Sequence, residues 1–470
     1  MTSHSDIDTL IASLHPHVSM HLFNDKLHPP VSLQPSKNTA DFRNLVQAFA
    51  TLFSFHSGCD AAAVTAERAP QSGNTSLSIC PSPSTPPGFE GNVKEWLVQF
   101  MDLRKEYKVT GGARHGDVFS PLEKSFILYT YKVCYPAMHQ RTIDQGFGDW
   151  EVFVETPEAV ADEAPPKPRK EEELLRKEYA KELRTFSELV KDFVHCMSRK
   201  SLGDDNHVLQ FHQSCMSIRD MMSNGGFVAF LNEYIYCDDV DPTLTYFGLP
   251  LALSILLTLS QNSKLQALDD QWSFNILDPS KGARQFSTVM TKTGLAERFG
   301  KVSGIKWEHV VRVFMEKSAA RPKGYGMGYE WTADKNMLST EGRVPVHPEI
   351  TLIQDLLENG DRKGEAYIAC SRMPCYASVM YAGAVNQTLE PDGARFTMRA
   401  DSPEWCQLYN AEPWILPEAT QPDVMERMKE FLLRDLGNLM YLWVQELWDD
   451  GHIASGNSGW DLEFDEPTIE

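Results

Sequence analysis

Two stretches decide the fold expected for the C-terminal half of the chain, VHPEITLIQDLL at residues 346–357 and AYIACSRMPCYASVMY at 366–381. In the first, Pro348 suits the first position of a helix, because its missing N–H would have no helical partner there. Apolar side chains then recur at helical spacing and predict a buried stripe made of Ile350, Ile353 and Leu357. We therefore expect His347 and Glu349 at the N-terminal end of this helix, exposed to a cleft.

The second stretch predicts a strand followed by another helix. Ala366–Cys370 is a short apolar run, and Pro374 and Cys375 open the helix. A thiol at a helix N-terminus is favoured as a thiolate, and hence as a metal ligand. Ser378 lies about one turn further on, so it projects from the same face as Cys375.

These residue types match what hydrolytic deamination of a nucleobase requires. A metal lowers the pKa of a bound water, and a nearby carboxyl moves the proton to the leaving ammonia. Zinc deaminases carry the signature H-x-E followed by P-C-x-x-C, in which one His and two Cys bind the metal. Here His347 and Glu349 form the triplet, and Cys375 follows the histidine by 28 residues. Taken singly, His347 would be a helix cap and Cys375 a buried, weakly polar thiol.

The segment from about 340 to 420 resembles the fungal nucleic-acid/nucleotide deaminase-like proteins. These are large intracellular proteins with a helical N-terminal region before a C-terminal deaminase domain. The matching residues are Tyr367, Ile368, Ser371, Cys375, Asn386, Arg399, Trp414 and Pro417. A Gly and a His that family members carry near the matched arginine are absent from the stretch FTMRADSPEW.

The resemblance implies a role for each matching site residue. His347 and Cys375 would be zinc ligands, and Glu349 would be the proton shuttle. Arg399 and Trp414 would contact the substrate. The implied reaction is hydrolytic deamination of cytosine or adenine in a nucleotide or nucleic acid.

Ser378 departs from the pattern at the third ligand. A neutral hydroxyl is a poor zinc ligand beside a thiolate, whose charge and softness suit the metal. Three outcomes stay open: zinc is lost, Cys370 supplies a replacement thiolate, or a two-ligand site binds metal weakly with extra water. In the first case the protein is a catalytically inactive pseudo-deaminase that acts as a protein-interaction scaffold.

The expected fold class is α+β and multi-domain. A mostly helical N-terminal region precedes a cytidine deaminase-like α/β/α domain with a mixed sheet. The predicted segments are an N-terminal helical segment at 1–68, a flexible Pro- and Ser-rich linker at 69–91, a helical region at 92–320 with a second linker at 155–169, the deaminase-like domain at 321–422, a C-terminal helix at 423–450 and an acidic tail at 451–470.

The net charge and the distribution of the cysteines limit which binding partners and which cellular compartment are expected. A formal net charge of -21 argues against non-specific coating of nucleic acid, although it does not describe a single cleft. Protein partners are expected at the helical region and the acidic tail. The nine cysteines are scattered and indicate reduced thiols, and the most apolar run, 247–259, is too short for a bilayer. We therefore expect an intracellular protein, cytoplasmic or nuclear, with no membrane contact.

Overall fold

The computed structural model describes residues 7–11, 40–56, 59, 61–68, 75–83, 85, 87–110, 119–145, 170–228, 248–261, 272–278, 284–299, 308, 310–312, 315, 323–326, 329–333, 337–344, 346–359, 364–372, 374–389, 394–398 and 415–434. The chain forms two compact units. We name Lys37–Ile276 the helical unit, and Met1–Ser36 together with Leu277–Glu470 the C-terminal unit.

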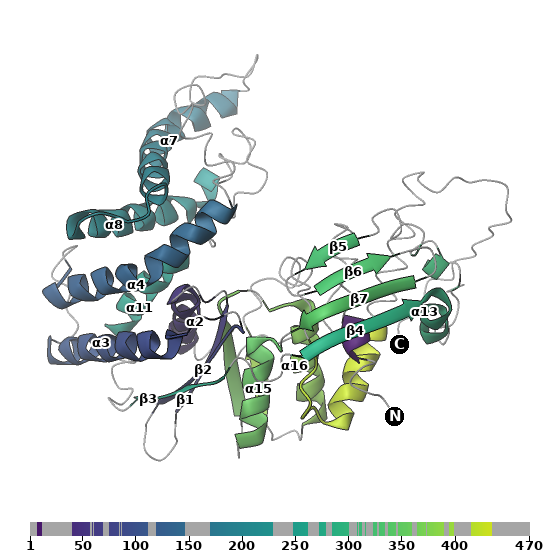
Figure 1. The fold of residues 1–470 in the computed structure, drawn as a ribbon. Helices are drawn as coiled ribbons and strands as arrows, with labels where there is room; N and C mark the ends of the chain where they lie inside the picture. The colour runs from purple at the N-terminus through teal and green to yellow at the C-terminus, as the bar shows by residue number, and fades with distance from the viewer. Residues whose placement is uncertain are drawn as a thin grey trace. The chain divides into compact units, whose positions relative to one another are not determined.

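Helices dominate the helical unit, as Figure 1 shows in purple to teal. Their bounds are α2 Ala40–Phe55, α3 Phe89–Thr110, α4 Pro121–Gln145, α7 Lys170–Met197, α8 Asp205–Met222 and α11 Gly248–Ser260. In α7 the apolar side chains Leu183, Phe186 and Phe193 are buried, as their helical spacing predicts. The apolar run at 247–259 forms α11 and is mostly buried.

Aromatic rings fill the core where α2, α3 and α4 meet. Trp96 and Phe100, one turn apart on α3, stack with ring centroids 5.8 Å apart. Phe49 of α2 meets these rings edge-on at 6.1 and 5.2 Å. The indole N–H of Trp96 donates to Thr130 Oγ1 of α4 at 2.9 Å. Because buried aromatic pairs combine large apolar area with a preferred geometry, this cluster fixes the packing of the three helices.

Strands also belong to the helical unit. β1 (Ala62–Arg68) and β2 (Thr75–Pro81) are antiparallel, and β3 (Trp272–Ile276) lies parallel to β2. Strand β2 falls inside 69–91, so the prediction of a flexible linker is wrong for these residues. All but one of its seven residues are buried. Pairing on both sides stabilises a segment whose neighbouring Pro and Ser residues indicated a loop.

Other predicted boundaries also differ from the structure. The segment 1–68 contains β1, and the region 92–320 contains β3 as well as β4 (Arg284–Thr291), so neither is wholly helical. The predicted domain 321–422 is only part of the C-terminal unit, whose second segment begins at residue 277. The predicted linker 155–169 and acidic tail 451–470 lie outside the described residues.

An antiparallel sheet forms one part of the C-terminal unit. Its strands are β4, β5 (Lys323–Gly326), β6 (Tyr329–Ala333) and β7 (Met337–Val344), in the order β4-β7-β6-β5. Figure 1 shows these strands side by side, with α13 (Lys292–Phe299) directly after β4.

Residues 7–11 form a helical turn that folds with the C-terminal unit. The Asp8 carboxylate accepts the backbone N–H of Leu416 at 2.7 Å. The hydroxyls of Thr9 and Thr288 lie 2.8 Å apart, which links this turn to β4. Hydrogen bonds therefore join the beginning of the chain to residues far along the sequence.

The helix–strand–helix prediction is confirmed in the second part of this unit. The elements are α15 (Pro348–Asn359), β8 (Gly364–Cys370), α16 (Tyr376–Thr388) and β9 (Ala394–Met398), and β8 and β9 are parallel. A further helix covers 422–434, the described part of the C-terminal helix predicted at 423–450. The fold is thus mixed α+β, with parallel and antiparallel pairing.

Candidate metal centre

The first half of the site is the start of α15. Pro348 opens the helix, and the carbonyl of His347 accepts the backbone N–H groups of Ile350 and Thr351, both at 3.0 Å. His347 therefore stands at the capping position, and Glu349 lies in the first turn. A carboxylate there is favoured by the unpaired N–H groups of the helix end.

The second half is the start of α16. Cys375 is the N-cap residue, with extended backbone, and its Sγ accepts the N–H of Ser378 at 3.4 Å. The Cys375 carbonyl also accepts the N–H of Val379 at 3.1 Å. This cap holds the sulfur and the Ser378 side chain on one face of the helix end, as the sequence predicts.

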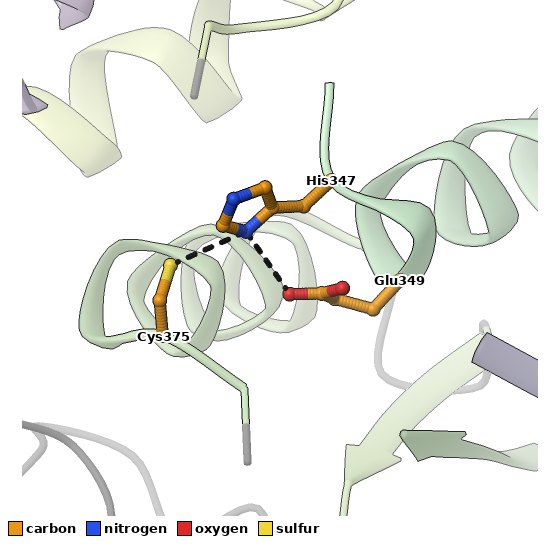
Figure 2. A group of neighbouring side chains, drawn as sticks. All are labelled: His347, Glu349 and Cys375. Carbon is orange, nitrogen blue, oxygen red and sulfur yellow. Dashed lines mark hydrogen bonds and ion pairs between the residues drawn. The ribbon is translucent and has the colours of Figure 1, made fainter. Parts of the chain in front are cut away.

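The two helix ends bring the side chains of three residues close to one atom of a fourth residue, His347 Nδ1. Glu349 Oε1 lies 3.4 Å from this nitrogen, Ser378 Oγ 3.3 Å and Cys375 Sγ 3.5 Å. The Cys375 sulfur and the Ser378 oxygen are 3.1 Å apart. Figure 2 shows His347, Glu349 and Cys375 pointing toward one another.

The expectation that His347 and Glu349 are exposed to a cleft is wrong. Each is 7% exposed, Cys375 is 3% exposed and Ser378 is fully buried. The physical reason lies in α15, which is buried beyond the predicted stripe of Ile350, Ile353 and Leu357: Leu352 and Leu356 are buried too, whereas Leu357 is only half-buried. Buried positions thus extend beyond one stripe and include Pro348 and Glu349 at the N-terminal end of the helix.

Charge coupling between His347 and Glu349 outweighs their burial. Burial alone lowers the pKa of His347, but the neighbouring Cys375 and Glu349 raise it well above its usual value. Burial alone raises the pKa of Glu349, but the charge of His347 and hydrogen bonds, including one with Ser378, lower it. His347 and Glu349 thus lie as a close pair inside the fold, with Nδ1 and Oε1 3.4 Å apart.

The geometry does not resemble a nucleophile–histidine–acid relay. In such a relay the nucleophile uses one ring nitrogen and the acid uses the other. Here the Cys375 sulfur and the Glu349 carboxylate both lie against Nδ1 of His347. Ligands of a common ion surround the ion and lie about 3–4 Å from one another, and the distances of these atoms from Nδ1 fall in that range.

The interatomic distances fit zinc. Tetrahedral zinc has a Zn–N bond of about 2.1 Å and a Zn–S bond of about 2.3 Å, which separates the two ligand atoms by about 3.6 Å. The observed separation between His347 Nδ1 and Cys375 Sγ is 3.5 Å, and Ser378 Oγ completes a triangle with edges of 3.3 and 3.1 Å. The donor set of imidazole and thiol also suits zinc.

Cys370 ends β8 and is buried. Burial raises the pKa of its thiol, and the charges of Glu349 and Cys375 raise it further, so this thiol stays protonated. Within the described part of the chain, His347, Glu349 and Cys375 have ligand atoms within 4.8 Å of one another, and this group does not include Cys370.

The other predicted residues are Arg399, Trp414 and Asn386. Arg399 and Trp414 lie outside the described residues, so their substrate roles stay predictions. Asn386 has a structural part to play: its side chain donates to the carbonyl of Phe396 and accepts the N–H of Phe396, both at 2.8 Å. This pair of bonds attaches α16 to β9.

Gln354 was missed by the reasoning from sequence. Its side-chain amide donates to the hydroxyl of Tyr381, and this hydrogen bond joins α15 to α16. An amide within an apolar helix face was the available signal, because a buried amide needs a partner.

No protein-family model, curated protein or solved structure matches this chain. Among the described helices, none has the length and apolar character needed to cross a bilayer.

Proposed function

We propose that this chain is a deaminase-like protein whose C-terminal unit binds zinc through His347 and Cys375. The observation that carries the proposal is the convergence of donor atoms at 3.1–3.5 Å, at two helix ends held by Pro348 and Pro374. The order H-x-E then P-C and the parallel pair β8–β9 support a deaminase-like domain with a mixed sheet.

The proposed reaction is hydrolytic deamination of cytosine or adenine in a nucleotide or nucleic acid. Bound zinc would lower the pKa of water to near neutrality. The protein's own contribution is the Glu349 carboxylate, which is buried and lies 3.4 Å from His347 Nδ1, close enough to accept and pass on a proton at Oε1. Burial of the site also excludes bulk water, which strengthens the electrostatic interactions of this carboxylate.

A catalytically inactive scaffold is the second candidate, and Ser378 favours it. The hydroxyl oxygen lies 3.1 Å from Cys375 Sγ and 3.3 Å from His347 Nδ1, so these groups already form a hydrogen-bonded cluster. Such a cluster can join two helix ends without an ion. Protein partners would then bind the charged face of α7 or the acidic tail at 451–470.

Metal analysis of the purified full-length protein tests the zinc site. We expect about one zinc per chain in wild type and loss of zinc in His347→Ala and Cys375→Ala, because structural binding requires these ligands. Cys215→Ala removes a buried thiol of the helical unit and is the matched control. Wild-type protein without stoichiometric zinc would overturn both the metal site and the catalytic function.

Ammonia release separates the two functions once zinc is present. The substrates are cytosine and adenine nucleosides, single strands and duplexes. Release that depends on zinc, and that is lost in Glu349→Gln at a zinc concentration that saturates the variant, supports deamination. Stoichiometric zinc with no ammonia release from any of these substrates supports the scaffold.

A further inference from the structure

We infer that Glu349 supplies the third metal-binding group of the resting site, in the place where Ser378 offers no thiolate. This inference rests on the proposed zinc site and concerns only its third ligand. The ligand atoms of His347, Glu349 and Cys375 lie within 4.8 Å of one another, and Glu349 Oε1 is 3.4 Å from His347 Nδ1. In Figure 2 the Glu349 carboxylate points at the same ring nitrogen as the Cys375 sulfur.

Charge balance favours the carboxylate over the hydroxyl. One imidazole and two thiolates give a divalent ion two negative charges, and replacing one thiolate by Ser378 removes one of them. Zinc held by His347 and Cys375 alone would leave a net positive charge in a site where these residues are 7% and 3% exposed. A buried charge of this kind is costly unless it is compensated. The Glu349 carboxylate restores neutrality and is a good zinc ligand.

Ser378 then affects metal binding through the residues that its side chain contacts. Its hydroxyl is fully buried and lies 3.1 Å from Cys375 Sγ and 3.3 Å from His347 Nδ1. Groups that hydrogen-bond to metal ligands fix the orientation of these ligands. Ser378 is therefore a positioning residue for the Cys375 thiolate and the His347 imidazole.

This assignment has a consequence for the proposed reaction. A carboxylate bound to the metal is not free to carry a proton. Glu349 must leave the metal before it can serve as the shuttle, so tight metal binding is expected together with slow turnover. A protein in which the carboxylate never leaves would be the scaffold described above.

Metal titration of the full chain without nucleotide tests the inference. Zn²⁺ affinity is measured against a chromophoric chelator, and Co²⁺ is followed by its absorption bands. We expect Glu349→Gln to weaken binding by more than about 100-fold, beyond the range of an outer-shell partner, and Ser378→Ala by about tenfold. Glu358→Gln makes the same change at an exposed position of α15 and should leave the affinity unchanged.

Several outcomes would overturn the inference. A larger loss in Ser378→Ala than in Glu349→Gln would make the hydroxyl the third ligand, and loss of binding in Cys370→Ala with normal binding in Glu349→Gln would assign Cys370. Wild type that binds neither ion would overturn the proposed site together with the inference. A thermal unfolding curve of each apo variant controls for misfolding. Glu349→Asp, which keeps a carboxylate, should bind more tightly than Glu349→Gln.

Discussion

Ser378 determines how much negative charge the site offers to a metal. Its oxygen lies 3.3 Å from His347 Nδ1 and 3.1 Å from Cys375 Sγ, so a sulfur at this position would meet the same atoms. We expect Ser378→Cys to tighten zinc binding by at least about tenfold, because a thiolate adds charge and a soft donor. Competition with a chelator measures this change. Ser287→Cys, on an exposed position of β4, should leave the affinity unchanged.

His56 is a buried titratable residue outside the site. Among the described residues neither of its ring nitrogens has a hydrogen-bond partner. Its ring centroid lies 5.8 Å from that of Phe53 and 5.7 Å from that of Trp96. Burial lowers the pKa of His56 from 6.5 to about 3. The folded protein therefore keeps this imidazole neutral through mild acid.

The stability of the helical unit should consequently fall in mild acid. Below pH 6.5 the unfolded chain takes up a proton at His56, and the folded chain does so only near pH 3. Stability thus decreases from pH 6.5 downward, by about 2 kcal/mol at pH 5. Urea unfolding at pH 7 and pH 5 measures the loss, which should be smaller in His56→Leu. His207→Gln, at an exposed histidine, should lose as much as wild type.

At the scale of elements, α4 begins with a reciprocal cap. The Glu123 carboxylate accepts the N–H of Ser120 at 2.6 Å, and the Ser120 hydroxyl accepts the N–H of Glu123 at 3.1 Å. The same carboxylate accepts the hydroxyl of Tyr107 at 2.6 Å and the side-chain amide of Gln261 at 2.9 Å. Glu123 is 1% exposed, so this cap also joins α4 to α3 and to the end of α11.

Removal of this carboxylate should destabilise the helical unit. We expect Glu123→Ala to lower the free energy of unfolding by about 2–3 kcal/mol, because several buried donors would lose their acceptor. Chemical denaturation provides the measurement. Glu90→Ala changes a first-turn carboxylate of α3 that is 62% exposed, and it should have little effect. Equal effects of the two substitutions would contradict the role of Glu123.

At the scale of the whole molecule, the N-terminal residues belong to the fold of the C-terminal unit. The Asp8 carboxylate is 2% exposed and accepts the N–H of Leu416 at 2.7 Å. We expect Asp8→Ala to cost about 1–3 kcal/mol, because it leaves this N–H buried and unpaired. Hydrogen exchange of residues 415–434 should speed up. Asp8→Asn keeps an acceptor oxygen and should be closer to wild type, and equal exchange in both variants would contradict this contact.

Local sequence patterns predicted the elements that carry the candidate site. Pro348, Pro374 and the apolar spacing between residues 350 and 385 act over one or two helix turns, so local rules predicted α15, β8 and α16. The same reasoning placed Cys375 at a helix end and Ser378 beside it. Local patterns did not predict β2, because its burial depends on pairing with β3, which is nearly two hundred residues away.

The contacts between the site residues depend on how α15 and α16 pack in three dimensions. The sequence did not predict that His347 and Glu349 are buried. Their burial follows from the packing of other elements against the start of α15, and the spacing of apolar residues along the helix does not contain this information. Nor did the sequence predict that the Cys375 sulfur, the Ser378 oxygen and the Glu349 carboxylate all converge on one nitrogen of His347. Distances between side chains of two helices follow from how those helices pack, and no local sequence rule contains that information.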